Sequence, residues 1–262
     1  MNHHFPDSAV VRQAVSLASR APSARNSQPW AWRVGAQSID LFLDDIGQPL
    51  RSSGDHRDAV ISCGIALHHM RVALSAFDWR SVVTRLPDPV NPCHLAHIEV
   101  EPRPGTARDV ALASAIPRRR TDRRRFATWA VPQDYLDLIE LRCADGGAVL
   151  RIASSPDADG ARLVVEVQDG DASALRAGEA TGVVLLEATV LGLASCRLTE
   201  SPHAPAARDL PRLRLLVPRP VSQVMVKVGW PEANADPLPA TPRRGVDLTT
   251  VFDPAALTVA AG

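Results

Sequence analysis

The sequence predicts an α+β protein of two pseudo-equivalent halves, each with helices packed on a mainly antiparallel sheet. The expected elements follow one order twice along the 262 residues: a helix, two strands, a long helix and a closing strand. A linker-like stretch, Pro102–Gly105, separates the two passes. In the first pass, Ser38–Leu43 alternates apolar and polar residues, as half-buried strands do. We therefore expect a first half at residues 1–105 and a second at 106–262.

The first half opens with a helix over about 9–20, because Asp7 or Ser8 can cap it and its apolar residues share one face. A hairpin turning at Gly35 follows, and turn-rich Pro87–Pro89 separates the last two strands. The expected hairpin strands, long helix and later strands are 31–34, 38–43, 57–76, 81–85 and 94–100.

The second half repeats this order with a shorter connection. We expect only about seven residues between Val167 and Leu175, where the first half has about a dozen between Leu43 and its long helix. The second half is therefore predicted to be trimmed at 167–175. Its expected helices are 131–143 and 175–193, and its expected strands are 148–153, 162–167 and 223–230, with a short strand after Gly192.

Composition excludes several classes of protein. No apolar run approaches the roughly 20 residues of a membrane span, and the first residues do not resemble a leader, so we expect a cytoplasmic protein with no membrane partner. The formal charge is zero and Lys227 is the only lysine, so general attraction to nucleic acid is not expected. The cysteines, which lack zinc-site or redox spacing, are expected to be small buried hydrophobic residues. They are Cys63, Cys93, Cys143 and Cys196.

A polar loop, Pro22–Trp30, follows the first helix. Two prolines fix φ near −65° on either side of a run of hydroxyl and amide groups, so we expect these groups to be held in place. A held polar loop suits a flat ligand that is rich in heteroatoms.

The densest charge in the chain is the arginine run Arg118–Arg125, which contains Thr121 and Asp122. Alternating arginine, threonine and arginine suits one phosphate group, because arginine forks bind phosphate in a bidentate way. The alternatives are a solvated, salt-bridged face and a nucleic-acid patch. The pair Arg243-Arg244 could be the other side of a phosphate clamp.

Other motifs are weaker or missing. The turn at Leu198–Pro202 follows a short strand, where backbone N–H groups often meet ligands, although a plain turn is the alternative. His3-His4 and His68-His69 lack metal-ligand spacing with a partner acid, so no metal site is expected. Serine-hydrolase, Rossmann and P-loop motifs are absent from the sequence.

The polar loop resembles the signature of FMN-dependent nitroreductases, a proline-serine pair followed by asparagine and then glutamine-proline-tryptophan. The stretch Arg119–Arg123 resembles that family's phosphate-binding element, but here it follows the loop instead of preceding it. This inverted order is similar to the Acg family, whose members are tandem nitroreductase-like pseudo-dimers. Further resemblance, in Ile61–Gly64, Arg176–Thr181 and the tail 228–244, extends over nearly the whole chain.

The resemblance implies a nitroreductase-like fold and one composite FMN site. Arg119, Thr121 and Arg123 would hold the phosphate end, with Arg243 or Arg244 helping. The first half would reach the flavin through Ser23, Arg25, Asn26 and Gln28. Thr199 and Glu200 match the family turn whose backbone lies near the flavin N5. Acg proteins usually carry a longer insertion that can cover the flavin, so the short connection at 167–175 suggests a more open pocket or one completed by another chain.

The expected activity is NAD(P)H-dependent reduction of an electron-poor small molecule through FMN, with no dedicated catalytic residue, because the cofactor performs the redox chemistry. One alternative is FMN storage or sequestration without turnover. Another is an arginine-rich nucleic-acid binder. A monomer acting as an intramolecular pseudo-dimer is expected, with a dimer as the alternative.

Overall fold

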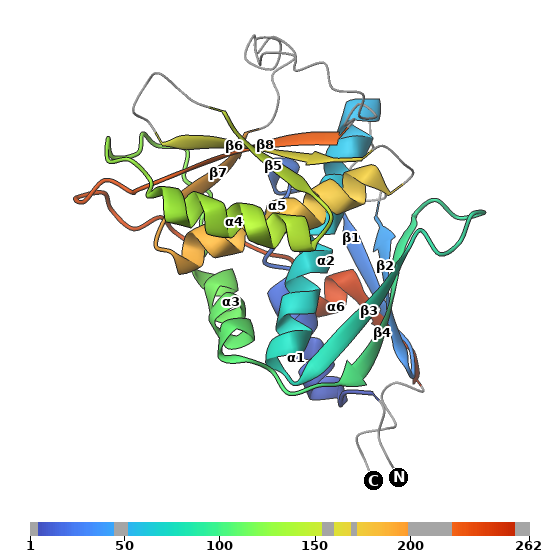
Figure 1. Ribbon diagram of the computed structural model, residues 1–262. Helices are drawn as coiled ribbons and strands as arrows, with labels where there is room; N and C mark the ends of the chain where they lie inside the picture. Colours follow the sequence, from blue (N-terminus) through green and yellow to red (C-terminus); the bar gives the residue numbers. More distant parts are fainter. Residues whose placement is uncertain (1–4, 45–51, 154–159, 169–171, 199–221, 255–262) are drawn as a thin grey trace. The chain divides into compact units, whose positions relative to one another are not determined.

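The structure is a computed structural model that describes residues 5–44, 52–153, 160–168, 172–198 and 222–254. The chain forms two compact units. Unit 1 comprises the residues up to Arg118 together with the tail from Thr241, and unit 2 comprises Arg119–Ala240. Figure 1 labels most of the helices and strands of both units.

Unit 1 is built on a five-stranded sheet in the order β3-β4-β2-β1-β9. Its strands pair antiparallel, except that β9 pairs parallel with β1. The inward residues of β2 are Ile39, Leu41 and Leu43, and α2 packs on the sheet and on α1 and α3. The elements are α1 Ser8–Ala18, η1 Ala24–Asn26, β1 Trp30–Val34, β2 Ser38–Leu43, α2 Ser53–Ala76, β3 Trp79–Arg85, β4 His94–Pro102, α3 Ala107–Arg118, α6 Val246–Thr249 and β9 Thr250–Phe252.

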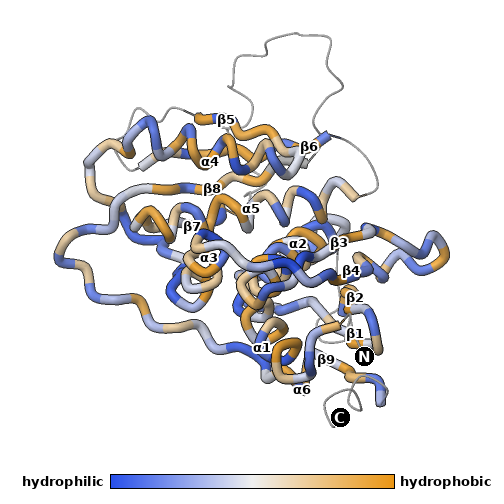
Figure 2. The backbone as a smooth tube through the Cα atoms, turned by 60° about the horizontal axis from the view of Figure 1, so that its bottom comes forward, coloured by the Kyte–Doolittle hydropathy of each residue, from blue (hydrophilic) through white to orange (hydrophobic). Residues whose placement is uncertain are grey.

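Unit 2 is built on a four-stranded antiparallel sheet in the order β5-β6-β8-β7. Helices α4 and α5 pack against one another and lie on one face of this sheet (Figure 1). Hydrophilic and hydrophobic bands alternate along α4 in Figure 2, as expected for a helix with one buried face. The elements are α4 Gln133–Asp145, β5 Val149–Ala153, β6 Ala161–Val167, α5 Ser173–Val190, β7 Ala194–Leu198 and β8 Ser222–Gly229.

The two units share one topology. In each, a helix precedes an antiparallel hairpin and a long helix follows; of the two strands after that helix, the second pairs with the second hairpin strand and the first lies at the sheet edge beyond it. The strand order β1-β2-β4-β3 of unit 1 corresponds element by element to β5-β6-β8-β7 of unit 2. The predicted α+β class with two pseudo-equivalent halves is therefore confirmed.

Local sequence signals explain where the first helices begin. Asp7 caps α1 by accepting a hydrogen bond from the Val10 N–H at 2.8 Å, and Ser52 caps α2 by accepting from Asp55 N–H. Helix α2 starts four residues earlier than the expected Arg57 because of this cap. Within the described parts of the chain, α2 alone is long and apolar enough to cross a membrane, but 78% of that stretch is buried, as in the core helix of a globular unit.

Several elements were not expected from the sequence, among them α3, α6 and β9. The apolar stretch near Val110 forms the helix α3, which packs on α2, so unit 1 continues to Arg118 rather than ending at residue 105. The tail also returns to unit 1, where α6 precedes β9 and β9 extends the sheet beside β1. The expected division at 105 and 106 followed Pro104-Gly105, which instead turn the chain from β4 into α3.

The cysteines are largely as expected. Cys63, Cys143 and Cys196 are buried thiols, whereas Cys93 is half-buried in the connection before β4. Burial raises the pKa of Cys143 to about 12, and the charges of Glu187 and Glu140 add to this effect. Such a thiol stays protonated at neutral pH, which suits a packing role.

Truncation of the unit 1 core tests this arrangement. Leu41→Ala should lower the free energy of unfolding by about 2–5 kcal/mol, because Leu41 is fully buried and truncation leaves a cavity. Val251→Ala on β9 is the control, since that side chain is 62% exposed, and it should cost less than about 0.5 kcal/mol. Urea unfolding followed by circular dichroism measures both, and equal losses would contradict the assigned burial.

Candidate functional site

The polar loop of unit 1 holds three non-glycine residues in the left-handed conformation. Arg25, Asn26 and Gln28 have φ values of 51°, 57° and 51°. Each such residue costs about 1 kcal/mol or more, so other contacts must fix the loop. The Ser23 hydroxyl accepts a hydrogen bond from Gln28 N–H at 2.9 Å, and Ser62 Oγ on α2 accepts from Ala24 N–H at 3.3 Å. The expectation of a held loop is confirmed, with hydrogen bonds as well as prolines holding it.

The carboxyl-terminal tail binds this loop through Arg243. Its NH1 donates to Asn26 Oδ1 at 2.9 Å, and its NH2 donates to the carbonyl oxygens of Arg20 and Ala21 at 3.3 and 3.1 Å. The Asn26 amide in turn donates to the Pro242 carbonyl at 3.2 Å. Arg243 therefore joins the end of α1, the loop and the tail.

Arg244 makes a second connection between the tail and the loop. Its backbone N–H donates to Gln28 Oε1 at 2.8 Å, and its guanidinium pairs with Asp44 Oδ2 at 3.2 Å and donates to Leu248 O. The Gln28 side-chain amide also donates to Asn26 O at 3.3 Å. The side chains of Asn26 and Gln28 are thus engaged within unit 1, whereas the Arg25 side chain is 83% exposed and lies 3.7 Å from Asp55.

In unit 2, the arginine segment Arg119–Arg125 is fastened to the sheet. Thr121 forms a parallel bridge with Ser195 on β7, and Asp122 N–H donates to Ser195 O at 3.0 Å. Beyond the segment, Phe126 is buried against Gly229, where a Cβ would lie 2.7 Å from the ring. The close approach of Phe126 to β8 therefore requires a glycine there.

The even-numbered and odd-numbered residues of the arginine segment make different contacts. Arg124 donates to both oxygens of Asp122, and Arg120 and Arg124 donate to the carbonyl oxygens of Leu238 and Asp236 at 3.1 and 2.8 Å. These even-numbered residues hold the chain after β8. The Asp122 pKa is lowered chiefly by the hydrogen bonds from the Arg124 side chain, against the opposing effect of burial.

The odd-numbered residues form the predicted anion set. Arg119 is buried, and its NH1 donates to Thr121 Oγ1 at 3.3 Å. Arg123 is exposed, and its positive charge opposes the burial that raises the pKa of Cys196. The set offers two guanidinium groups and a hydroxyl along one extended segment.

The structure joins the sequence-predicted residues into two groups. Unit 1 brings Asn26 and Gln28 together with Arg243 and Arg244, and unit 2 brings Arg119 together with Thr121. Thr199 and Glu200 lie outside the described residues. Sequence reasoning missed the supporting groups Asp44, Ser62, Asp122 and Arg124. Of these, only the Asp122-x-Arg124 spacing carried a local signal.

The fold and these two fastened segments define an α+β protein of two topologically equivalent units, each presenting one group of polar side chains. No family model matches the chain. It is 36% identical to the Mycobacterium tuberculosis H37Rv protein named "Putative NAD(P)H nitroreductase Rv3131", over 93% of this chain and 92% of that protein. It is 32% identical to "Putative NAD(P)H nitroreductase acg" of the same strain, over 91% and 94% of the two chains.

The chain therefore belongs to the Acg family of nitroreductase-like proteins. A third relative, "Uncharacterized protein Rv3127" of the same strain, is 31% identical over 91% of this chain and 92% of that protein. The alignment to Rv3131 has 315 positions, which exceeds the 262 residues of this chain by 53, so the relative has internal segments that this chain lacks.

The chain also aligns with chains of solved structures. One of them is the FMN and NADPH-dependent nitroreductase NfnB from Sphigopyxis sp. strain HMH, with 17% identity over 96% of this chain and 93% of that one. The TM-score is 0.26.

A double-mutant cycle tests the connection between loop and tail. Asn26→Ala and Arg243→Ala should each lower the free energy of unfolding by about 1–3 kcal/mol, because each leaves polar partners unsatisfied. The double variant should lose less than the sum of the single losses, since both substitutions remove the same 2.9 Å contact. Strictly additive losses in urea unfolding would contradict a direct contact.

The Asp122 carboxylate provides a pH test in unit 2. Its pKa is lowered in the folded protein, so its stabilisation is present above the ordinary aspartate pKa of about 3.9 and is lost as pH falls through the folded value. Asp122→Asn should therefore cost about 1 kcal/mol at neutral pH, and the cost should shrink below about pH 4. The comparison is made by urea unfolding at each pH.

Asp145→Asn on α4 is the matched control for this titration. Its carboxylate is 63% exposed and 3.5 Å from Arg142 NH1, so it should change stability little at any pH. A constant Asp122→Asn cost across the titration would refute the assigned ion pair.

Proposed function

We propose that the protein is an FMN-dependent NAD(P)H oxidoreductase that reduces an electron-poor small molecule, using one flavin held by donor groups from both units. The observation that carries the proposal is the kinship, at 36% and 32% identity over nearly the whole chain, to proteins named NAD(P)H nitroreductases. The anion set of unit 2 and the held loop of unit 1 support it because they offer the two kinds of contact that a flavin nucleotide needs.

The donor set of unit 2 fits a phosphate group. Phosphate takes bidentate hydrogen bonds from guanidinium groups and single ones from hydroxyls, and Arg119, Thr121 and Arg123 supply both kinds. The bridge between Thr121 and Ser195 fixes the backbone of this set, so little ordering remains to be done on binding. In the proposal, Arg123 supplies the exposed charge and Arg119 orients the Thr121 hydroxyl.

In unit 1, fewer residues are available to contact the uncharged part of a flavin than the sequence implied. The Asn26 and Gln28 amides are engaged with the tail and the loop, so they act as positioning groups in this structure. Ser23 keeps its own hydroxyl proton after accepting from Gln28 N–H, and the Arg25 guanidinium is exposed. These two residues are the proposed direct contacts from the loop.

When bound, FMN supplies the chemistry of accepting hydride from NAD(P)H and passing electrons to a second molecule. The chain's own residues bind and orient. The guanidinium of Arg25 is a cation, and a cation close to the flavin favours the negative charge that the flavin gains on reduction. Since the redox step belongs to the cofactor, a dedicated acid or base pair is not needed.

The spectrum of the purified protein tests the proposal. The oxidised protein should absorb near 450 nm, roughly where flavins do, and anaerobic NADPH or NADH should bleach that band. A yellow protein that neither nucleotide bleaches would instead support FMN storage without turnover. Colourless protein that does not take up added FMN would exclude both.

We also propose that the flavin pocket is more open than in the longer relatives. Strand β6 ends at Val167 and α5 begins at Ser173, whereas β2 ends at Leu43 and α2 begins at Ser53. The 53 or more alignment positions without a residue of this chain support a shortened protein. A structure with FMN fully enclosed by a single chain would refute this proposal.

Single-arginine variants test the composite site. Arg123→Ala and Arg25→Ala should each weaken FMN binding about tenfold or more, because each removes a charge-assisted hydrogen bond from a different unit. Arg125→Ala is the control, since it removes the same charge from an exposed residue of the same segment. Flavin fluorescence titration gives the Kd, and loss of affinity confined to one unit's variant would contradict a composite site.

A further inference from the structure

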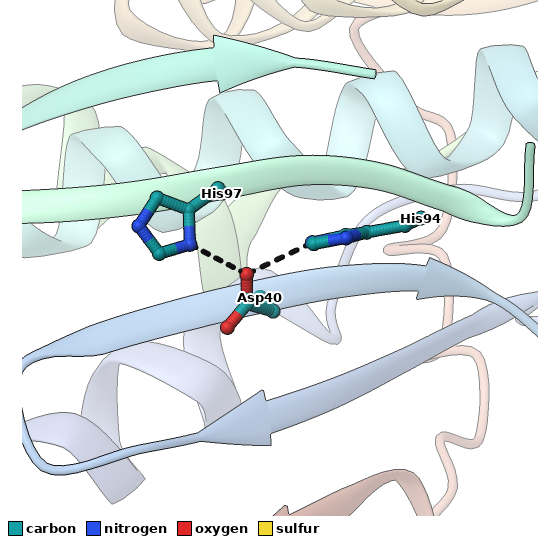
Figure 3. Close-up of side chains that lie close together, drawn as sticks. All are labelled: Asp40, His94 and His97. Atoms are coloured by element: carbon teal, nitrogen blue, oxygen red, sulfur yellow. Dashed lines mark hydrogen bonds and ion pairs between the residues drawn. The ribbon is translucent and has the colours of Figure 1, made fainter. Parts of the chain in front are cut away.

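A cluster of one carboxylate and two imidazoles lies on the face of the unit 1 sheet opposite the buried residues of β2. Asp40 comes from β2, and His94 and His97 come from the neighbouring strand β4 (Figure 3). Asp40 alternates with the buried Ile39 and Leu41, so it points to the other side of the sheet. None of the three residues belongs to the proposed flavin contacts.

A β-bulge brings both imidazoles to this face. His94 and His97 are three residues apart, so in a regular strand they would point to opposite faces. The register shifts between Leu41 and Phe42, which pair with Ala96 and His94, and Leu95 is left as the extra residue on β4. This shift restores the alternation and turns both rings toward Asp40.

The three side chains converge on one point. The distance from His94 Nε2 to Asp40 Oδ1 is 2.9 Å, and that from His97 Nδ1 to the same oxygen is 2.7 Å. All three ligand atoms lie within 4.8 Å of one another. Asp40 and His94 are about one-sixth exposed and His97 about one-third, so the cluster is partly shielded yet open to solvent.

We propose that Asp40, His94 and His97 bind a divalent transition-metal ion of the zinc type, with water completing its coordination. Two imidazole nitrogens and one carboxylate oxygen are ligands that zinc prefers, whereas Mg²⁺ and Ca²⁺ favour oxygen alone. Ligands about 2 Å from a tetrahedral ion lie about 3.3 Å apart. The observed 2.7 and 2.9 Å therefore call for the two oxygen–nitrogen pairs to open by about half an ångström on binding.

The surroundings hold the ligands in place. Phe42 stacks on the His94 ring, with centroids 4.4 Å apart and planes at 19°, which fixes how that ring presents Nε2. Ser38 Oγ lies 3.5 Å from Asp40 Oδ2, the oxygen that the imidazoles leave open. Arg33 lies opposite Asp40 on β1, but its Nε is 3.7 Å from Asp253 Oδ1. Its positive charge therefore pairs with Asp253 and not with Asp40. Such supporting contacts orient ligands and raise affinity.

Isothermal titration of the full chain with Zn²⁺, after treatment with a chelator, tests the site. The wild-type protein should bind one Zn²⁺ with a Kd in the micromolar range or tighter. His97→Ala and Asp40→Asn should each weaken binding at least about tenfold, because each removes one of three ligands. The amide oxygen of Asp40→Asn can still accept hydrogen bonds from the imidazoles, but the negative charge that favours a metal ion is gone. This variant therefore tests the metal ligand without removing the hydrogen bonds.

His56→Ala is the matched control, since it removes an exposed imidazole from α2. It should leave the Zn²⁺ affinity unchanged. Equal affinity in the wild type, His97→Ala and Asp40→Asn would overturn the proposal and attribute binding to other histidines or cysteines. A wild-type Kd weaker than millimolar would also overturn it.

A measurement on the unmodified protein removes dependence on the variants. In nitrogen-15 NMR spectra of the histidine rings, Zn²⁺ should shift His94 at Nε2 and His97 at Nδ1, the nitrogens that face Asp40. Shifts confined to other histidines would contradict the assignment. The outcome does not depend on whether FMN binds, so this proposal and the proposed function can fail separately.

Discussion

The contact between the tail and the polar loop is the constraint on which the rest of unit 1 depends. Three left-handed residues in a four-residue span would relax if nothing opposed them, and beside the contacts from Ser23 and Ser62 the opposing hydrogen bonds come from Arg243 and Arg244, more than two hundred residues later. The same tail then forms α6 and adds β9 beside β1. The shape of the loop and the completeness of the sheet are therefore set together.

Much of the fold could be predicted because periodicity and caps are local signals. Asp7 and the apolar face of α1 gave the first helix, and the alternation in Ser38–Leu43 gave β2 and its inward face. Helix α3 was not predicted because its only buried residues are Ala115 and Ile116 and because Pro117 interrupts its last turn. Strand β9 was not predicted because three residues are too few to show an alternating pattern of apolar and polar side chains. Its pairing with β1 also joins segments that are far apart in the sequence.

The sequence nominated residues for the candidate site but not the contacts that each of them makes. The alternation of arginine and threonine singled out Arg119 and Thr121, and the structure joins these two side chains by a hydrogen bond. The sequence could not show that the Asn26 and Gln28 amides are occupied by the tail. His94 and His97 gave no signal either, since their spacing of three suits a helix, and only the bulge opposite Leu41 and Phe42 brings them to one face.

Unit 2 is inserted into unit 1, because the chain leaves unit 1 after Arg118 and returns at Thr241. During synthesis, every residue of unit 2 is therefore made before β9 and the arginines that fasten the polar loop. The ribosome thus imposes an order in which the loop of the candidate site is completed last, and a nascent chain that stops short of Arg243 would contain every residue of unit 2 but lack the arginines that fasten the loop of unit 1.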